Sequence, residues 1–364
     1  MGGHECTRRD FVASLAALGA SPARTRVSSF PDERQRYTDS ATELSVLRLT
    51  SPEHSSLLPP ACQRAVSRRG TFLLFSSDRT GSPQPMQMFL NTGESRQLTE
   101  ARSLDPSSLA LSQDDRSAYF FDGPALRQIA LNAQRGAEVY RVPEGWSRAR
   151  GFSLSRDGSK AYLAESKNGR WRLREAPLGS RAGEPVTVSE AEAPLLDPLP
   201  RPGHGEVLYR DGEGLLGIAG AHGNQRLPLA PGRHGSAFWS AGGESLLYLD
   251  LPGGGELNAI REWVAESGSD RLIAPTSQYA SFAPNANGSV FVGSSASKPS
   301  PYIVLMLRVT HRELALCEHR SSDPAAVSPI FSPDSQRVLF QTDRDGKPAI
   351  YMLDVQRLVE RTDF

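Results

Sequence analysis

The sequence has no run of about 18 apolar residues, so it contains no segment long enough to cross a bilayer as a helix. It also has no excess of either charge, because Lys plus Arg and Asp plus Glu both total 41. A net charge of zero argues against electrostatic attachment to nucleic acid or to an anionic membrane. Long helices are disfavoured as well, since 32 glycines and 27 prolines are typical of a chain with many tight turns.

Cysteine is scarce, and the sequence shows no cysteine-dense framework of the kind found in disulfide scaffolds. Of the three cysteines, Cys6 lies in an N-terminal segment that we expect to be removed. Cys62 and Cys317 could pair in an exported protein, or they could remain as small buried apolar side chains. We expect them to be unpaired.

The N-terminal segment resembles a twin-arginine export signal. Arg8 and Arg9 precede a short apolar stretch at 12–20, and a small-residue cleavage site follows at 21–23. The pattern predicts that residues 1–23 are a signal peptide and that the mature protein is periplasmic or secreted. The alternative is a short amphipathic cytosolic helix. Residues 24–41 are polar without a steady period, which indicates a linker or surface arm.

A repeated β pattern is clearest near the C-terminus, at residues 329–355. Two short apolar runs, at 338–340 and 350–353, flank a polar turn at 343–346, and a Ser-Pro-Asp-Ser turn precedes the first run. Proline and glycine supply the backbone angles of such turns, and both runs are rich in β-branched or aromatic residues. The stretch therefore predicts a β-meander.

Imperfect copies of this meander recur about every 40–50 residues, which is the signature of a β-propeller. Seven units can be recognised, and the last one ends after three strands. The alternating segment 44–49 is left over at the other end, and pairing it with the seventh sheet would supply a fourth strand and close the ring. We therefore predict an all-β fold, a single seven-bladed β-propeller domain over residues 42–364, closed by an N-terminal strand.

Several motifs resemble those of a known family. The Ser-Pro-Asp-Gly type corners are shared by many bacterial propellers, including those of TolB type. A narrower similarity, over roughly residues 36–355, is to the oligogalacturonate lyase family, and it is carried by segments 37–42, 47–50 with His54, 93–99, 316–322 and 338–343. The resemblance implies a seven-bladed propeller that uses a divalent metal to cleave short galacturonate oligomers by β-elimination.

The sequence departs from that family where the chemistry is expected. Ser236, Ala326 and Ser328 stand at the positions of three metal-binding histidines, and Asp323 stands at the position of a glutamine. In the family, the strand that corresponds to the one ending at 208–211 carries a histidine that looks like the general base. This chain lacks that histidine. Neutral hydroxyls are weak ligands compared with imidazole, so we expect no metal of the family's kind.

The remaining candidates for substrate binding are Arg201, His54, His319 and His234. Arg201 matches the family's arginine that faces the uronate, and a planar guanidinium suits a carboxylate. His54 and His319 match family positions, and each either faces the funnel or has a hydrogen-bonded structural role. His234 either replaces a lost ligand or, as we favour, is a solvated turn residue. His204 is also expected in a solvated turn.

These observations favour an exported, non-catalytic propeller, a pseudoenzyme candidate, that binds a small acidic saccharide of uronate type in its central funnel without a cofactor. The alternative is an active oligogalacturonate lyase in pectin degradation, with a divalent metal such as manganese. The sequence assigns no catalytic residue, indicates no nucleic-acid partner and no membrane span, and leaves the oligomeric state open.

Overall fold

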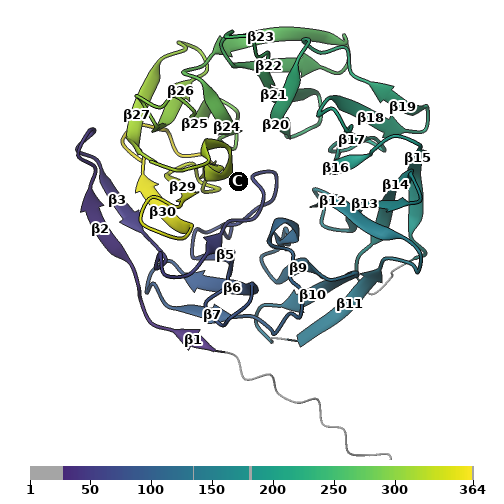
Figure 1. The fold of residues 1–364 in the computed structure, drawn as a ribbon, viewed down its shortest axis with the longest axis horizontal. Coiled ribbons are helices and arrows are strands. Elements are labelled where there is room, and N and C mark those ends of the chain that lie inside the picture. The colour runs from purple at the N-terminus through teal and green to yellow at the C-terminus, as the bar shows by residue number, and fades with distance from the viewer. Residues whose placement is uncertain (1–27, 134, 180–182, 363–364) are drawn as a thin grey trace, which may run out of the picture.

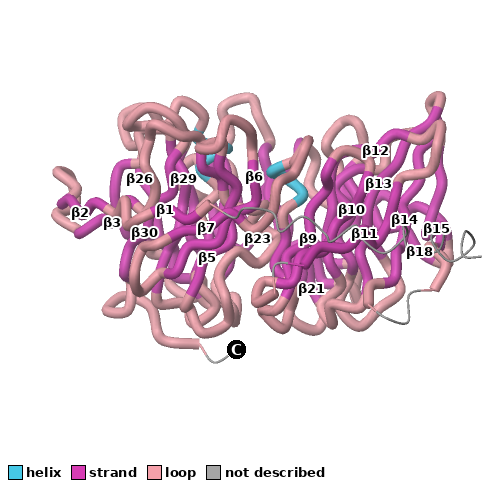
Figure 2. The backbone as a smooth tube through the Cα atoms, turned by 90° about the horizontal axis from the view of Figure 1, so that it is seen from below, coloured by secondary structure: helices cyan, strands magenta, loops and turns pink. Residues whose placement is uncertain are grey.

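The computed structural model describes residues 28–133, 135–179 and 183–362, so the predicted signal peptide lies outside the described residues. Seven antiparallel sheets are arranged in a ring around a central channel (Figure 1). Seen edge-on, the sheets stand side by side with loops at both faces of the ring (Figure 2). The predicted all-β, seven-bladed propeller is confirmed.

Each blade is one sheet of four or five strands. The first blade contains β1 (Ser29–Phe30), β4 (Ser56–Leu57), β5 (Phe72–Ser77), β6 (Gln84–Phe89) and β7 (Ser95–Gln97). The second contains β8 (Ala110–Leu111), β9 (Ser117–Asp122), β10 (Ala125–Ala130) and β11 (Arg135–Arg141). The third contains β12 (Ser147–Leu154), β13 (Lys160–Lys167), β14 (Arg170–Pro177) and β15 (Val186–Ala191).

The fourth blade contains β16 (Leu196–Pro200), β17 (Val207–Arg210), β18 (Leu216–Gly220) and β19 (Gly223–Arg226). The fifth contains β20 (Arg233–Trp239), β21 (Ser245–Leu251), β22 (Ala259–Val264) and β23 (Ser269–Pro275). The sixth contains β24 (Tyr279–Pro284), β25 (Val290–Ser295), β26 (Tyr302–Leu307) and β27 (Glu313–Glu318). The seventh contains β2 (Gln35–Thr38), β3 (Ser45–Arg48), β28 (Ile330–Phe331), β29 (Arg337–Thr342) and β30 (Ala349–Asp354). Two short 3-10 helices, η1 (Pro106–Ser108) and η2 (Pro324–Val327), precede the second and seventh blades.

The ring is closed by strand β3, which pairs antiparallel with β30 in the seventh sheet. Val46 lies opposite Leu353, and both side chains are buried in the largest apolar cluster of the chain. Phe340 and Tyr351 stack in the same cluster, with ring centroids 5.4 Å apart. The predicted closure by an N-terminal strand is therefore confirmed, and burial of its apolar face stabilises it.

The arm that precedes the closing strand also contributes to the sheets. Strand β1 pairs with β7 at the outer edge of the first blade, and β2 pairs with β3 at the outer edge of the seventh. Both strands are short, and each has a single partly buried aromatic side chain, Phe30 or Tyr37, so they carry little of the alternation that identifies a strand in a sequence. They cover edges that would otherwise present unpaired backbone groups.

The repeated turns have the geometry that their residues predict. In the third blade the amide of Gly158 donates to the carbonyl of Ser155, and the Asp157 carboxylate accepts from the amide of Ser159 at 3.0 Å. In the last blade Gly346 has φ 139°, a value that favours glycine. These turns are structural, because they orient successive strands of one blade.

The described residues contain no helix that is long and apolar enough to cross a membrane. Within the same residues Cys62 and Cys317 are both free thiols, as expected. Cys317 is buried in the core of the sixth blade, whereas Cys62 is accessible.

Candidate binding site

The innermost strands of four neighbouring blades are each interrupted by a β-bulge or similar irregularity. The irregularities lie between Arg148 and Phe152 in β12 and between Leu196 and Leu199 in β16. The corresponding irregularities in the next two blades lie at 234–237 in β20 and at 279–281 in β24. A bulge redirects side chains away from the regular pleat and is common beside binding sites. Residues from the first three irregular segments line one cavity in the channel.

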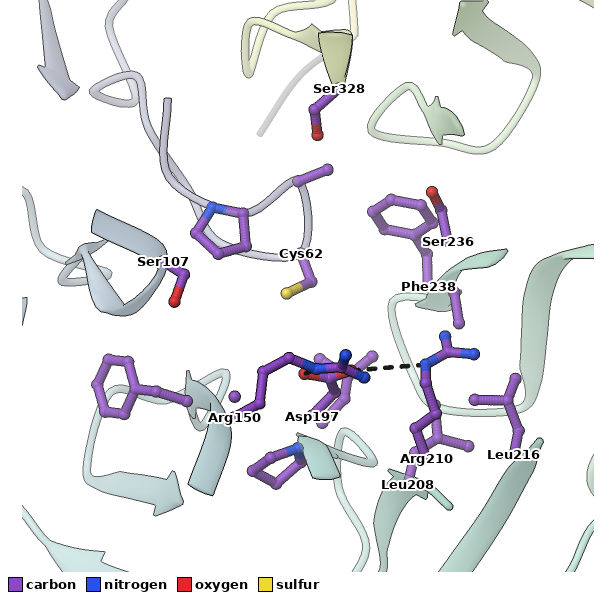
Figure 3. Close-up of a pocket in the computed structure, with 17 residues that line it drawn as sticks. Cys62, Ser107, Arg150, Asp197, Leu208, Arg210, Leu216, Ser236, Phe238 and Ser328 are labelled. Atoms are coloured by element: carbon purple, nitrogen blue, oxygen red, sulfur yellow. Dashed lines mark hydrogen bonds and ion pairs between the residues drawn. The ribbon is translucent and has the colours of Figure 1, made fainter. Parts of the chain in front are cut away.

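This cavity, called here the central pocket, has a volume of about 340 Å³ (Figure 3). Its polar lining comes from Cys62, Ser107, Arg150, Asp197, Arg210, Ser236 and Ser328. Its apolar lining includes Pro60, Phe152, Leu199 and Phe238. A mostly apolar cavity with a few convergent polar groups is typical of a site for a small molecule.

The charged part of the pocket is one carboxylate between two guanidinium groups. Arg150 donates to both oxygens of Asp197, at 3.0 Å from Nε and 2.7 Å from Nη2. On the other side, Nε of Arg210 lies 3.5 Å from Asp197 Oδ2. Two cations and one anion leave one net positive charge. The group therefore favours an anionic ligand.

The backbone fixes this arrangement closely. Asp197 has φ 49°, in the left-handed region, and Gly151 has φ 98°. A Cβ atom on Gly151 would lie 2.3 Å from the Cα atom of Asp197, so only glycine allows the two strands to approach this closely. The close approach places Arg150 and Asp197 side by side in the pocket.

Arg210 is held by the backbone of two blades. Its guanidinium donates to the carbonyls of Gly214 at 2.8 Å and of Gly235 at 2.7 Å, and also to the carbonyl of His234. Burial lowers the pKa of Arg210, and the Asp197 carboxylate opposes that effect. Since arginine starts from a very high pKa, Arg210 remains charged at neutral pH. It therefore supplies a fixed positive charge to the wall of the pocket.

The four residues at the positions where the resemblance implies metal ligands, Ser236, Asp323, Ala326 and Ser328, do not form a metal-binding set. Ser236 and Ser328 line the central pocket, so the structure does bring these two positions together. Asp323 caps η2, with its carboxylate accepting from the amide of Ala325 at 3.0 Å, and Ala326 in the same helix offers only a methyl side chain. Among the described residues no three His, Cys, Asp or Glu side chains gather closely enough to hold a metal ion. Two hydroxyls and a helix-capping carboxylate do not fit a first-row divalent metal.

His234 is buried in strand β20 rather than solvated in a turn, which differs from the interpretation we favoured from the sequence. Its Nδ1 accepts from the amide of Leu216 at 3.2 Å, and its Nε2 lies 3.1 Å from the carbonyl of Ala230. The ring also packs edge-on against Tyr248. Burial lowers the pKa of His234, so the neutral ring that these two bonds require is the stable form. Arg210 contacts the main-chain carbonyl of His234, but His234 does not line the pocket.

His319 also has a hydrogen-bonded structural position. Its Nε2 lies 2.9 Å from the carbonyl of Ser295, and its Nδ1 accepts from the amide of Ser321 at 3.0 Å. Burial lowers its pKa as well. His54 lies in the loop after β3, with Nδ1 4.0 Å from Asp78. Neither histidine lines the central pocket.

Arg201 lies just after β16, the strand that contains Asp197 near its start. Its Nε donates to the carbonyl of Gly243 at 2.7 Å, and its Nη1 lies 2.5 Å from Glu206. With His204 it lines a separate cavity between turns of the third and fourth blades. The role of Arg201 in substrate binding stays a prediction, but the structure does not bring it together with Arg150, Asp197 and Arg210.

The sequence profile of a family described as oligogalacturonate lyase matches residues 27–177. The oligogalacturonate lyase of Dickeya dadantii is 23% identical, over 88% of this chain and 95% of that protein. The oligogalacturonide lyase of Pectobacterium atrosepticum is 22% identical over the same shares.

Solved structures show the same fold. A structure described as an oligogalacturonate lyase in complex with manganese has a TM-score of 0.83 and 22% identity, covering 91% of this chain and 98% of that chain. The oligogalacturonate lyase of Vibrio parahaemolyticus has a TM-score of 0.82 and 21% identity, covering 90% and 98%. At these identities the structural likeness establishes the seven-bladed fold.

Proposed function

Because this chain is a seven-bladed propeller related to the oligogalacturonate lyases, we propose that it binds a short uronate saccharide in the central pocket and does not cleave it by metal-assisted elimination. The observation that carries the proposal is the pair of guanidinium groups of Arg150 and Arg210 in a pocket where Ser236 and Ser328 stand at two of the positions expected for metal-binding histidines. The pocket contains two guanidinium groups, which can bind a carboxylate, and no imidazole is among its lining residues.

Recognition of the carboxylate rests on Arg150. Its side chain is 59% exposed, and in the described part of the chain its Nη1 group makes no hydrogen bond to protein. That N–H group can donate to a ligand carboxylate while Nε and Nη2 remain on Asp197. A hydrogen bond between charged groups is shorter and stronger than one between neutral groups.

The rest of the pocket suits a sugar ring. Ser236 and Ser328 supply hydroxyls that can both donate and accept, as the hydroxyls of a saccharide do, and the Ser107 hydroxyl, which donates to Asp105, can still accept. Phe238 and Leu199 supply apolar surface for the C–H face of a sugar. The volume of about 340 Å³ is at the lower end of the range for small-molecule pockets, which favours a short saccharide.

Elimination from a uronate needs charge withdrawn from the carboxylate, a base for the proton beside it, and a proton for the leaving oxygen. Arg150 and Arg210 can perform the first task in part. Both oxygens of Asp197 accept hydrogen bonds from Arg150, and Oδ2 also lies 3.5 Å from Nε of Arg210, so these two guanidiniums occupy the carboxylate. Cys62 also lines the pocket, and although the residue is partly exposed in the channel, desolvation by the surrounding residues raises the pKa of its thiol to about 12. At neutral pH the thiol is therefore neutral and is a weak base.

A second candidate function is an active lyase on short pectic oligomers. The observation that favours it is the similarity over 88% of the chain to two proteins that are named as lyases. In that case the groups that hold a metal and move the proton would be residues that we have not identified.

Calorimetric titration with digalacturonate tests the binding proposal. We expect saturable binding by the purified protein that persists after treatment with a chelator. Fully methyl-esterified digalacturonate is the matched control, because it retains the sugars and loses the charges, and we expect its affinity to be at least tenfold lower. Equal affinities for the acid and the ester, or no binding of the acid, would contradict the proposal.

A further inference from the structure

A loop of the first blade crosses the channel beside the central pocket. This segment, called here the central loop, comprises residues 58–64 and follows β4. In Figure 1 it extends from the first blade into the middle of the ring. Pro60, Ala61 and Cys62 in this loop line the pocket, and Figure 3 shows the Cys62 side chain directed into it.

The central loop is attached to three other blades. At its start the amide of Leu58 donates to Gln341 Oε1 of the seventh blade at 2.7 Å. Near its end the buried amide group of Gln63 donates to the carbonyl of Phe152 in the third blade at 2.9 Å. Arg64 forms an ion pair of 2.7 Å with Asp115 of the second blade. Attachments at both ends, together with two successive prolines, give the loop one defined position.

The central loop also separates two cavities. A smaller cavity of about 150 Å³ adjoins the central pocket and is lined by Gln63, Arg64 and residues of the sixth and seventh blades. Ala61 and Phe238 line both cavities. These two residues therefore form part of a wall between the central pocket and the smaller cavity.

We propose that the central loop is the fixed floor of the central pocket and that the side chain of Cys62 sets how far a bound uronate saccharide enters it. The inference rests on the proposed function and adds a residue that determines which lengths of saccharide fit. The carboxylate is fixed laterally by Arg150, so a larger side chain at position 62 leaves less room for the sugar between the guanidinium and the floor. A smaller one leaves more.

Substitutions of increasing size at position 62 test this inference. We expect Cys62→Leu to weaken digalacturonate binding several-fold and Cys62→Phe to weaken it at least tenfold, measured by calorimetry on the full chain. Cys62→Ala should shift the preference from digalacturonate toward trigalacturonate. Val309→Phe is the control, because Val309 is 89% exposed in the sixth blade and its substitution adds similar bulk outside the pocket.

Protection of the Cys62 thiol from alkylation gives a second measurement that requires no change in the loop. In a full-length Cys6→Ser background Cys62 is the accessible thiol, because Cys317 is fully buried. Because the thiolate is the reacting form and the pKa of this thiol is raised, the reaction is followed at mildly alkaline pH, where we expect saturating digalacturonate to slow the alkylation of Cys62 by iodoacetamide at least tenfold. The ester of digalacturonate, at the same concentration, should protect much less.

The outcomes separate this inference from the proposed function. If wild-type protein binds digalacturonate but Cys62→Phe binds it equally well, or if the ligand leaves the alkylation rate unchanged, the inference about the loop is wrong and the proposed function stands. If wild-type protein binds no uronate saccharide, the proposed function is wrong and the inference fails with it.

Discussion

Replacement of Arg150 by glutamine should separate ligand binding from stability. The Arg150–Asp197 ion pair is 2.7 Å long, but the two side chains are 59% and 37% exposed. Ion pairs at this exposure contribute about 0–1 kcal/mol to folding, so Arg150→Gln should unfold at nearly the wild-type denaturant concentration. The guanidinium has a larger effect on binding, because it supplies a charge-assisted bond to the ligand carboxylate.

A hydrogen bond to a charged group contributes about 1.5–3 kcal/mol, which corresponds to roughly a tenfold to 150-fold rise in the Kd for digalacturonate. Arg141→Gln is a matched control, because Arg141 forms an ion pair of 2.5 Å with Glu138 at 55% and 36% exposure on the outer strand of the second blade. Calorimetry gives both Kd values, and urea unfolding gives both stabilities. Equal effects of the two substitutions on the Kd would refute the role of Arg150.

Three further predictions concern closure, pH and export. Leu353 lies opposite Val46 in the closing sheet, and Leu353→Ala should lower the free energy of unfolding, measured in urea, by about 2–5 kcal/mol. An unchanged urea midpoint would contradict a packed closure. Burial lowers the pKa of His319 below its unfolded value of about 6.5, so the unfolded state binds more protons and stability should fall as the pH drops below about 6.5. His319→Gln should flatten that part of the stability profile, and a profile identical to wild type would contradict the assignment. Replacement of Arg8 and Arg9 by lysine should retain the precursor in the cytoplasm, and unchanged export by cell fractionation would indicate another signal.

The fold was predictable because its signals are local. Each blade repeats the same short-range chemistry, with a Ser-x-Asp-Gly or related turn between strands of β-branched and aromatic residues. The closing strand at Ser45–Arg48 was predicted because its alternating pattern had no partner within its own repeat. Strands β1 and β2 were not predicted, since each is a short edge strand with only one partly buried aromatic residue and so has no such alternation.

The charged group of the pocket was not predictable in the same way. Arg150, Asp197 and Arg210 come from three different strands, and β-bulges and left-handed backbone angles bring them together. The sequence marks these features only by Gly151 next to Arg150, which is weak evidence by itself. Conversely, Arg201 matched a family motif, but its ion pair with Glu206 and its position beyond β16 separate it from the pocket.

The central claim is that the pocket binds a uronate saccharide without metal-assisted elimination. Its most direct test is the ultraviolet absorbance of unsaturated product during incubation of saturating digalacturonate with purified protein, with added manganese and after chelation. We predict that the protein forms no unsaturated product in either condition, although the same preparation binds digalacturonate in the calorimeter. Unsaturated product that forms with manganese and disappears on chelation would contradict the claim and identify the protein as a metal-dependent lyase.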